Sequence, residues 1–251
     1  SFLLLSECGE GLVVDPQLAD IDQLSTLMQT LGVERISTAT ATHYHSDHSD
    51  GLNYVRQHFG AAIWLHPQVA APIADCNLLD VPWLPKASIA ADRRLPATGR
   101  FRWNEYHFAI RPFPGQTLWH CAFDAHIDGC HVLFSGDNFQ PPSRWNGTGG
   151  FCAFNGSRFS TGFGHSAQVA LDLAPDIVCN GHGCIYPFSA DHYRRIVRWS
   201  QRAEQSVRAL CPSVDWLADY DPRTLRLTPF VQRAKRGQTL DLQLVYSNNS
   251  Q

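Results

Sequence analysis

Residues Thr42-His43-Tyr44-His45-Ser46-Asp47-His48 contain an H-x-H-x-D-H pattern, which follows directly on a Thr- and Ala-rich run over residues 36–42. Such a run is typical of a buried strand, and alternate side chains of a strand share one face. His43 and His45 can therefore point at one ion, and Asp47 and His48 can reach a second ion after the chain turns. Imidazole and carboxylate ligands together favour zinc, iron or manganese over calcium. The pattern predicts a metal site at the end of this strand.

The chain on both sides of this pattern alternates between strands and helices. Residues 2–5 and 12–14 are apolar runs separated by a glycine-bearing turn, as in a β-hairpin. Apolar residues recur at helical spacing over residues 21–31. A second helix is expected at 52–59, before a strand at 61–65. This order of elements predicts an α/β sandwich.

The second half of the chain continues the alternation around two irregular stretches. Residues 69–102 contain several prolines and little periodicity, which predicts an irregular insertion. Residues 139–164 are dense in Gly, Pro and aromatic residues, and loops of this length are often functional. Strands are expected at 106–113, 118–127, 130–134 and 177–179, and helices at 166–173 and 190–210.

The composition changes after Pro212, which predicts a division of the chain into two parts. We expect a catalytic domain over residues 1–211 and a C-terminal β extension over residues 212–251, or the start of a further domain there. The chain does not begin with Met, so we expect a fragment or a processed product.

Charge and cysteine usage narrow the classes of partner. The formal net charge of -3 gives no basic surface for nucleic acid or for an anionic membrane. No apolar run is long enough to span a bilayer. The eight cysteines are scattered without a C-x-x-C pair, so we expect buried thiols and a cytoplasmic location. These features favour a small-molecule substrate, and they leave the oligomeric state open.

Three further motifs place potential ligands at strand ends or in tight turns. They are Pro114-Gly115-Gln116-Thr117-Leu118-Trp119-His120, Phe134-Ser135-Gly136-Asp137 and Asn180-Gly181-His182-Gly183. In this order, and after the H-x-H-x-D-H pattern, they resemble the motifs of the metallo-β-lactamase superfamily. The sequence is most similar to the glyoxalase II-like hydrolase branch, over residues 2–210. Other histidines, His165 included, are expected to be ordinary surface or core residues.

The resemblance implies a four-layer αββα sandwich of mixed β-sheets flanked by helices, with the metal site at one edge. It implies that His43, His45 and His120 hold a first divalent metal ion. Asp47, His48 and His182 would hold a second ion, and Asp137 would bridge both. Zinc is the expected metal, with iron or manganese as alternatives. Two such ions can share one water and lower its pKa, and Asp47 is the expected catalytic residue that orients the resulting hydroxide and carries a proton.

The sequence departs from the family pattern at two positions near His120. Gln116 replaces the usual second histidine and Trp119 replaces the usual glycine. Neither position holds a metal in the family, so the site is expected to survive with altered surroundings. No cysteine stands at the second-metal position, and the bridging Asp137 disfavours hydrolysis of lactam antibiotics.

Three classes of function therefore remain. The leading hypothesis is a dinuclear metal-dependent hydrolase that uses a metal-bridging hydroxide on a small ester, thioester, lactone or related substrate. The second is a mononuclear iron oxidoreductase similar to persulfide dioxygenases, with His43, His120 and Asp137 as ligands. The third is a metal-binding module without catalytic activity. Retention of the full second-metal set favours the first.

Overall fold

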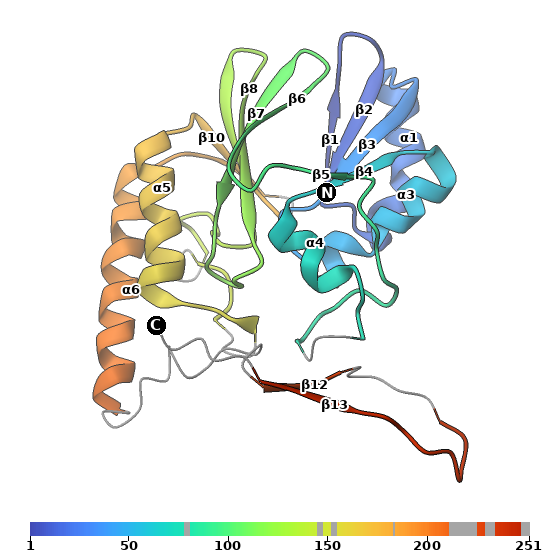
Figure 1. Cartoon of the computed structure of the whole chain (residues 1–251). Helices are drawn as coiled ribbons and strands as arrows, with labels where there is room; N and C mark the ends of the chain where they lie inside the picture. Colours follow the sequence, from blue (N-terminus) through green and yellow to red (C-terminus); the bar gives the residue numbers. More distant parts are fainter. Residues whose placement is uncertain are drawn as a thin grey trace.

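Two β-sheets face each other in the centre of the molecule, and helices cover the outer face of each sheet (Figure 1). This computed structural model describes residues 1–77, 81–144, 148–151, 155–182, 184–210, 225–228 and 234–246. The four layers run helix, sheet, sheet, helix. The predicted αββα sandwich is therefore confirmed.

The first sheet has five strands in the order β1-β2-β3-β4-β5. Strands β1 (Phe2–Leu5) and β2 (Glu10–Val14) form the expected antiparallel hairpin. Strands β3 (Arg35–Thr40), β4 (Ala62–Leu65) and β5 (Arg93–Arg94) then add in parallel. Parallel pairing brings the carboxyl ends of β2 and β3 to the same edge, directly before the H-x-H-x-D-H pattern.

The second sheet has six strands in the order β11-β10-β9-β8-β7-β6. Strands β6 (Gly99–Trp103), β7 (Tyr106–Pro112), β8 (Cys121–Ile127) and β9 (Cys130–Gly136) form an antiparallel meander. Strand β10 (Ile177–Asn180) pairs in parallel with β9, and β11 (Ile185–Pro187) closes the edge. The parallel pair again places two strand ends at one edge of the sheet.

Two of the helices on the first sheet, α1 (Ile21–Leu31) and α3 (Gly51–Phe59), lie where the sequence predicts helices. The helix α1 ends at Gly32, and α3 ends at Gly60, both glycines having left-handed backbone geometry. A two-turn helix, α4 (Pro67–Ile73), follows β4, and a single turn, α2 (Ser46–Ser49), carries Asp47 and His48. Leu24, Leu52 and Val55 bury their side chains in the same core as the strands.

Two helices cover the second sheet, at the left of Figure 1. They are α5 (His165–Leu173) and α6 (Ala190–Leu210), and a π-helical segment, η3 (Phe159–Gly164), leads into α5. Phe163 and Ile196 are buried with Leu133 and Val178 of the sheet in a second core. A short turn, η1 (Leu18–Asp20), precedes α1 on the opposite side of the molecule.

Two irregular stretches are more ordered than predicted. The predicted insertion at 69–102 contains most of α4 as well as β5 and the beginning of β6, so that prediction was wrong. Val69 and Ile73 are fully buried, and this burial stabilises a helix that its prolines conceal from a periodicity argument. The predicted loop at 139–164 likewise ends in η3, where Phe159 and Phe163 pack on Trp199 of α6 with ring centroids 5.8 Å apart.

The C-terminal segment contains an antiparallel pair, β12 (Leu225–Thr228) and β13 (Gln243–Tyr246). This pair extends away from the sandwich (Figure 1). Residues 211–224 and 229–233 lie outside the described part of the chain, as do 247–251, so the division into 1–211 and 212–251 stays a prediction.

None of the helices in the described part of the chain combines the length and the apolar character needed to cross a membrane. The cysteines that the structure describes are free thiols. Cys121 and Cys179 are buried as expected, whereas Cys8 and Cys130 are exposed, so burial was wrongly predicted for those two.

Candidate metal centre

The predicted ligands lie at one edge of the sandwich, where strand ends from both sheets meet. A main-chain bridge between His43 and His120 connects the segment after β3 to the segment before β8. Two hydrogen bonds continue it, from Cys121 N to Thr42 O at 2.8 Å and from Phe113 N to His120 O at 3.1 Å. Asp137 directly follows β9, and His182 comes shortly after the parallel strand β10. The topology therefore brings together residues that are far apart in the sequence.

Three buried groups form one potential metal site: His43, His45 and Asp137, whose ligand atoms all lie within 4.8 Å of one another. Nε2 of His43 lies 3.1 Å from Nδ1 of His45 and 4.0 Å from Oδ2 of Asp137. The two imidazoles thus direct one nitrogen each to the same point.

A second potential metal site shares Asp137 and adds Asp47, His48 and His182 within the same 4.8 Å limit. Asp137 Oδ1 lies 3.2 Å from Nε2 of His48, and its Oδ2 lies 2.9 Å from Nε2 of His182. Asp47 Oδ2 is 3.7 Å from each of these two imidazole nitrogens. The side chains of Asp47 and His182 are 40% and 46% exposed, so this group opens to solvent.

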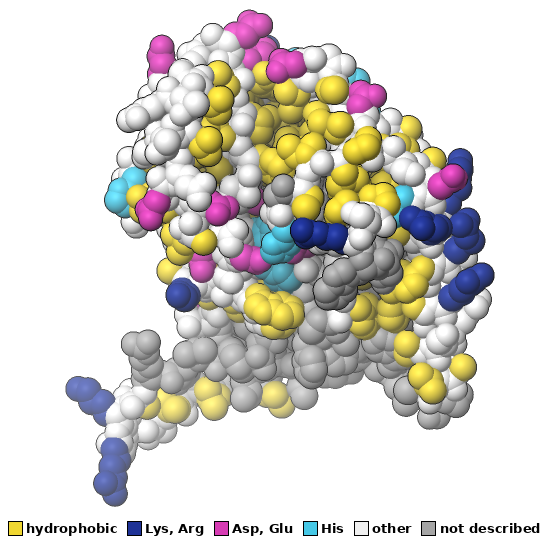
Figure 2. All heavy atoms as spheres, turned by 180° about the vertical axis from the view of Figure 1, so that it is seen from behind, with side chains coloured by type: hydrophobic (Ala, Val, Ile, Leu, Met, Phe, Trp, Pro, Cys, Tyr) yellow, Lys and Arg dark blue, Asp and Glu magenta, His cyan; other side chains and the backbone are white. Residues whose placement is uncertain are grey.

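Figure 2 shows this opening from behind the view of Figure 1. Histidine side chains reach the surface there, with acidic and hydrophobic side chains beside them. The edge of the sandwich that carries the candidate ligands is therefore accessible to a molecule from solution.

His120 belongs to neither group by that distance limit, but it lies against the first. Its ring stacks on the ring of His43 with centroids 4.8 Å apart. Both ring nitrogens of His120 are buried, and neither has a hydrogen-bond partner among the described residues. An unsatisfied buried polar atom costs about 1–3 kcal/mol, and a bound cation would satisfy one of these nitrogens. The side chains present therefore fit a metal at this point.

Outer contacts hold two of the histidines from behind. Asp15 accepts hydrogen bonds from the Thr42 backbone at 2.6 Å and the Thr42 hydroxyl at 2.8 Å, and its Oδ2 lies 3.3 Å from Nδ1 of His48. Asn155 Oδ1 lies 2.9 Å from Nε2 of His45 and accepts a hydrogen bond from the Tyr44 hydroxyl. Each contact leaves the other ring nitrogen free to face the site.

The carboxylate shared by both groups has its own partner. Gln116, the replacement for the usual histidine, donates from its amide to Asp137 Oδ2 at 3.3 Å. Asn180 supports the turn after β10, because its Oδ1 accepts from the His182 backbone at 2.9 Å and its amide donates to Gly136 O at 3.2 Å. These side chains fix the positions of Asp137 and His182.

Sequence reasoning missed Asp15 and Asn155. Asp15 directly follows β2, and the parallel pairing of β2 with β3 was the signal that could have placed it beside Thr42. Asn155 lies in the predicted loop at 139–164, and nothing in its neighbouring sequence indicates a contact with His45.

Burial and mutual charge determine the protonation of the cluster. Burial lowers the pKa of His120 to about 3 and keeps the pKa of His43 well below its usual value, so both rings are neutral. Burial also opposes a charge on His48, yet Asp137 and Asp15 outweigh it and raise the pKa of His48 well above its usual value. Burial opposes ionisation of Asp137, but the charge of His48 and the hydrogen bonds from His182 and His48 together outweigh it and hold the pKa of Asp137 well below its usual value. A cation here would displace the His48 proton, since ligands bind metals deprotonated.

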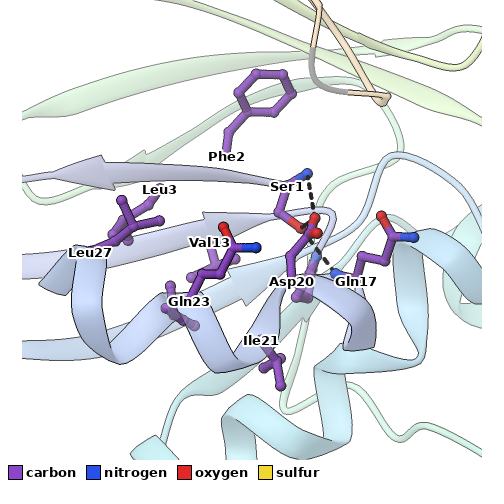
Figure 3. A pocket seen from close by; sticks show the side chains of 11 residues that line it. Ser1, Phe2, Leu3, Val13, Gln17, Asp20, Ile21, Gln23 and Leu27 are labelled. Atoms are coloured by element: carbon purple, nitrogen blue, oxygen red, sulfur yellow. Dashed lines mark hydrogen bonds and ion pairs between the residues drawn. The ribbon is translucent and has the colours of Figure 1, made fainter.

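A separate surface pocket lies between the β1–β2 hairpin and α1 (Figure 3). Its lining includes Leu3, Val13 and Leu27. At one end the Ser1 hydroxyl donates to Asp20 at 3.3 Å and accepts from the Gln17 backbone at 3.0 Å. None of the seven predicted ligands lines this pocket, which therefore is not the candidate centre.

The fold and the site define a class of αββα sandwich proteins that gather histidines and aspartates at one edge, as a candidate metal centre. Within that class the chain belongs to the metallo-beta-lactamase superfamily, whose family model matches residues 1–182. The resemblance predicted from the motifs is thus confirmed.

Known relatives agree with this assignment. The chain is 31% identical over 128 residues to a hydroxyacylglutathione hydrolase from Albidiferax ferrireducens. That match covers 51% of this chain but only 42% of the relative, so the chain spans less than half of that protein's length.

Solved structures share the fold. The crystal structure of BLEG-1, a B3 metallo-beta-lactamase, aligns with a TM-score of 0.57 at 22% identity, covering 75% of this chain and 88% of that one. A metallo-beta-lactamase from Cronobacter sakazakii aligns with a TM-score of 0.62 at 15% identity, covering 84% and 88%. The relatives carry hydrolase names, and the superfamily binds divalent metals.

Proposed function

We propose that this protein is a dinuclear metallohydrolase that acts on a small ester, thioester, lactone or related substrate. The observation that carries the proposal is the position of Asp137, whose carboxylate belongs to both potential metal sites. One oxygen faces His48, and the other faces His182 and His43. A carboxylate shared in this way is suited to bridging two cations.

The proposed ligands divide as the family resemblance implies. His43, His45 and His120 would hold one ion, Asp47, His48 and His182 the other, and Asp137 would contact both. When bound, two divalent cations lower the pKa of a shared water and stabilise an oxyanion. Imidazole with carboxylate and no thiolate suits zinc, with iron or manganese as alternatives.

Asp47 is the proposed catalytic residue as well as a ligand. Its carboxylate is 40% exposed, in contrast to the buried carboxylate of Asp137, and it faces His48 and His182. It can therefore receive a proton at Oδ2 from a group at the site and release it to the leaving group or to solvent.

The alternative functions require fewer of the clustered histidines and aspartates than the chain retains. A single-iron oxidoreductase needs only His43, His120 and Asp137. It gives no role to the second group, in which Asp47, His48 and His182 lie around the same carboxylate. A module without activity would likewise not need the half-exposed Asp47. The complete second group favours hydrolysis.

Metal analysis tests the number and place of the ions. We expect about two zinc ions per purified chain, and we expect His45→Ala and Asp137→Ala to lower zinc content and activity together. His107→Ala is the matched control, because this exposed histidine lies on β7, outside both groups. Unchanged zinc stoichiometry in both site variants would contradict the ligand assignment, and one iron with oxygen uptake would indicate the oxidoreductase.

The substrate class is tested with the same zinc-loaded protein. A panel of thioesters, lactones, phosphodiesters and lactams should show turnover for an ester-type substrate, and little for lactams. The cytoplasmic location and the absence of a nucleic-acid or membrane partner stay predictions.

A further inference from the structure

Trp83 lies beside His45, one of the proposed ligands of the candidate metal centre. Its indole contacts the imidazole of His45 edge to face, with ring centroids 5.1 Å apart and planes inclined at 65°. Trp83 is nevertheless 53% exposed, more than any other tryptophan or any phenylalanine that the structure describes. An indole in this position touches a proposed metal ligand on one side and solvent on the other.

The backbone of Trp83 has a left-handed conformation, with φ of 60°. Bulky residues rarely adopt this geometry, and strained backbone of this kind clusters at functional sites. Two hydrogen bonds hold the segment in place: Ser46 N donates to Trp83 O at 2.8 Å, and the Tyr44 hydroxyl donates to Pro82 O at 2.9 Å. The strained segment is thus tied to the H-x-H-x-D-H loop itself.

Packing in the hydrophobic core does not account for the position of the Trp83 indole. Val81 is buried in the main core and Leu84 packs against that core, whereas Trp83 belongs to neither hydrophobic cluster. The segment therefore directs neighbouring apolar side chains inward and this one toward the site. Exposed aromatic surface beside a polar centre is typical of ligand sites, which combine an apolar wall with a few polar groups.

We propose that Trp83 determines substrate specificity by forming the apolar wall against which the acyl part of the substrate packs. The acyl group favoured by such a wall is aromatic, because a planar ring covers an indole most completely and adds a ring–ring attraction. Acetyl groups are too small to use it. This inference rests on the proposed hydrolase function and adds a substrate class to it.

The test compares two hydroxamates that share one metal-binding head and differ only in the acyl group. We would measure Kd for phenylacetohydroxamate and acetohydroxamate with the zinc-loaded full chain by calorimetry. The wild type should bind the phenyl compound about tenfold more tightly, as expected for partial burial of one ring. Trp83→Asn should reduce that ratio to about 1, since asparagine tolerates the left-handed backbone and only the ring is lost.

Three variants complete the design. Trp83→Phe should keep most of the preference, and Trp83→Gly should repeat the result of Trp83→Asn with no backbone strain. Leu31→Asn removes another exposed apolar side chain, at the end of α1, and should leave the ratio unchanged. Zinc content is measured in every variant to show whether the metal centre is intact.

The outcomes separate the two proposals. An equal ratio in the zinc-loaded wild type and in Trp83→Asn, or no preference in the wild type, would overturn the role of Trp83 and leave the hydrolase proposal standing. A wild-type chain that takes up neither zinc nor iron nor manganese would overturn both. Zinc uptake and a Trp83-dependent preference without thioester or lactone turnover would contradict only the proposed reaction.

Discussion

Gly136 shows how little space separates the chain from its candidate ligands. It is the last residue of β9, directly before Asp137, with φ of 50°, and a Cβ added there would lie 2.4 Å from Nε2 of His120 and 2.5 Å from the Thr42 hydroxyl. Only glycine combines this backbone with this contact. Gly136→Ala should therefore displace His120, lower zinc content and destabilise the fold by more than about 1 kcal/mol.

Gly60→Ala is the matched control for that substitution. Gly60 has φ of 69°, but an added Cβ meets nothing within 4 Å, so this variant reports backbone strain alone. Its cost should be about 1 kcal/mol, with full zinc content. Equal zinc content in the two alanine variants would contradict the close approach at His120.

The sequence allowed site residues to be proposed where their chemical type and order are distinctive. The seven proposed ligands could be named because His and Asp recur at strand ends in one order along the chain. Asp15 was missed because only the pairing of β2 with β3 places it beside Thr42. Asn155 and Trp83 could not be named, since their roles depend on contacts with His45 and Ser46 across long sequence separations. An aspartate after a strand or a tryptophan among prolines has no distinctive pattern by itself.

At the scale of elements, α6 stabilises the second sheet through a small buried face. Ile196 is fully buried together with Val178 and Leu133, whereas Arg198 on the same helix is exposed. Ile196→Ala should lower the free energy of unfolding by about 2–5 kcal/mol, because it removes buried methyl groups and leaves a cavity. Arg198→Ala should change it by less than about 0.5 kcal/mol. Denaturant titration checks both, and similar losses in the two variants would show that α6 does not pack as described.

Long elements were predictable and short ones were not. Helices α1 and α6 have the predicted bounds because helical periodicity persists over 11 and 21 residues. Helix α4 has 7 residues with a proline at its start and another inside it, and β11 has only 3 residues. Such elements are stabilised by packing and by strand pairing, which periodicity does not report.

At the scale of the whole molecule, both sheets and all seven proposed ligands lie before residue 211. A chain that ends at Leu210 should therefore fold, bind the same amount of zinc as the full chain and unfold in one transition. Circular dichroism and metal analysis of the shortened protein test this expectation. Loss of zinc or of cooperative unfolding would show that residues 211–251 belong to the same folding unit.

The bridge between His43 and His120 lies where the two sheets meet, with ligands contributed from both halves of the chain. A cation held there would cross-link the two sheets in addition to this main-chain bridge, since its ligands come from both. The free energy of binding the ion would then add to the free energy of unfolding, because only the folded chain brings the ligands together. A melting curve recorded with a chelator would consequently report unfolding of the metal-free protein. One recorded with added zinc would report unfolding together with release of the bound ion.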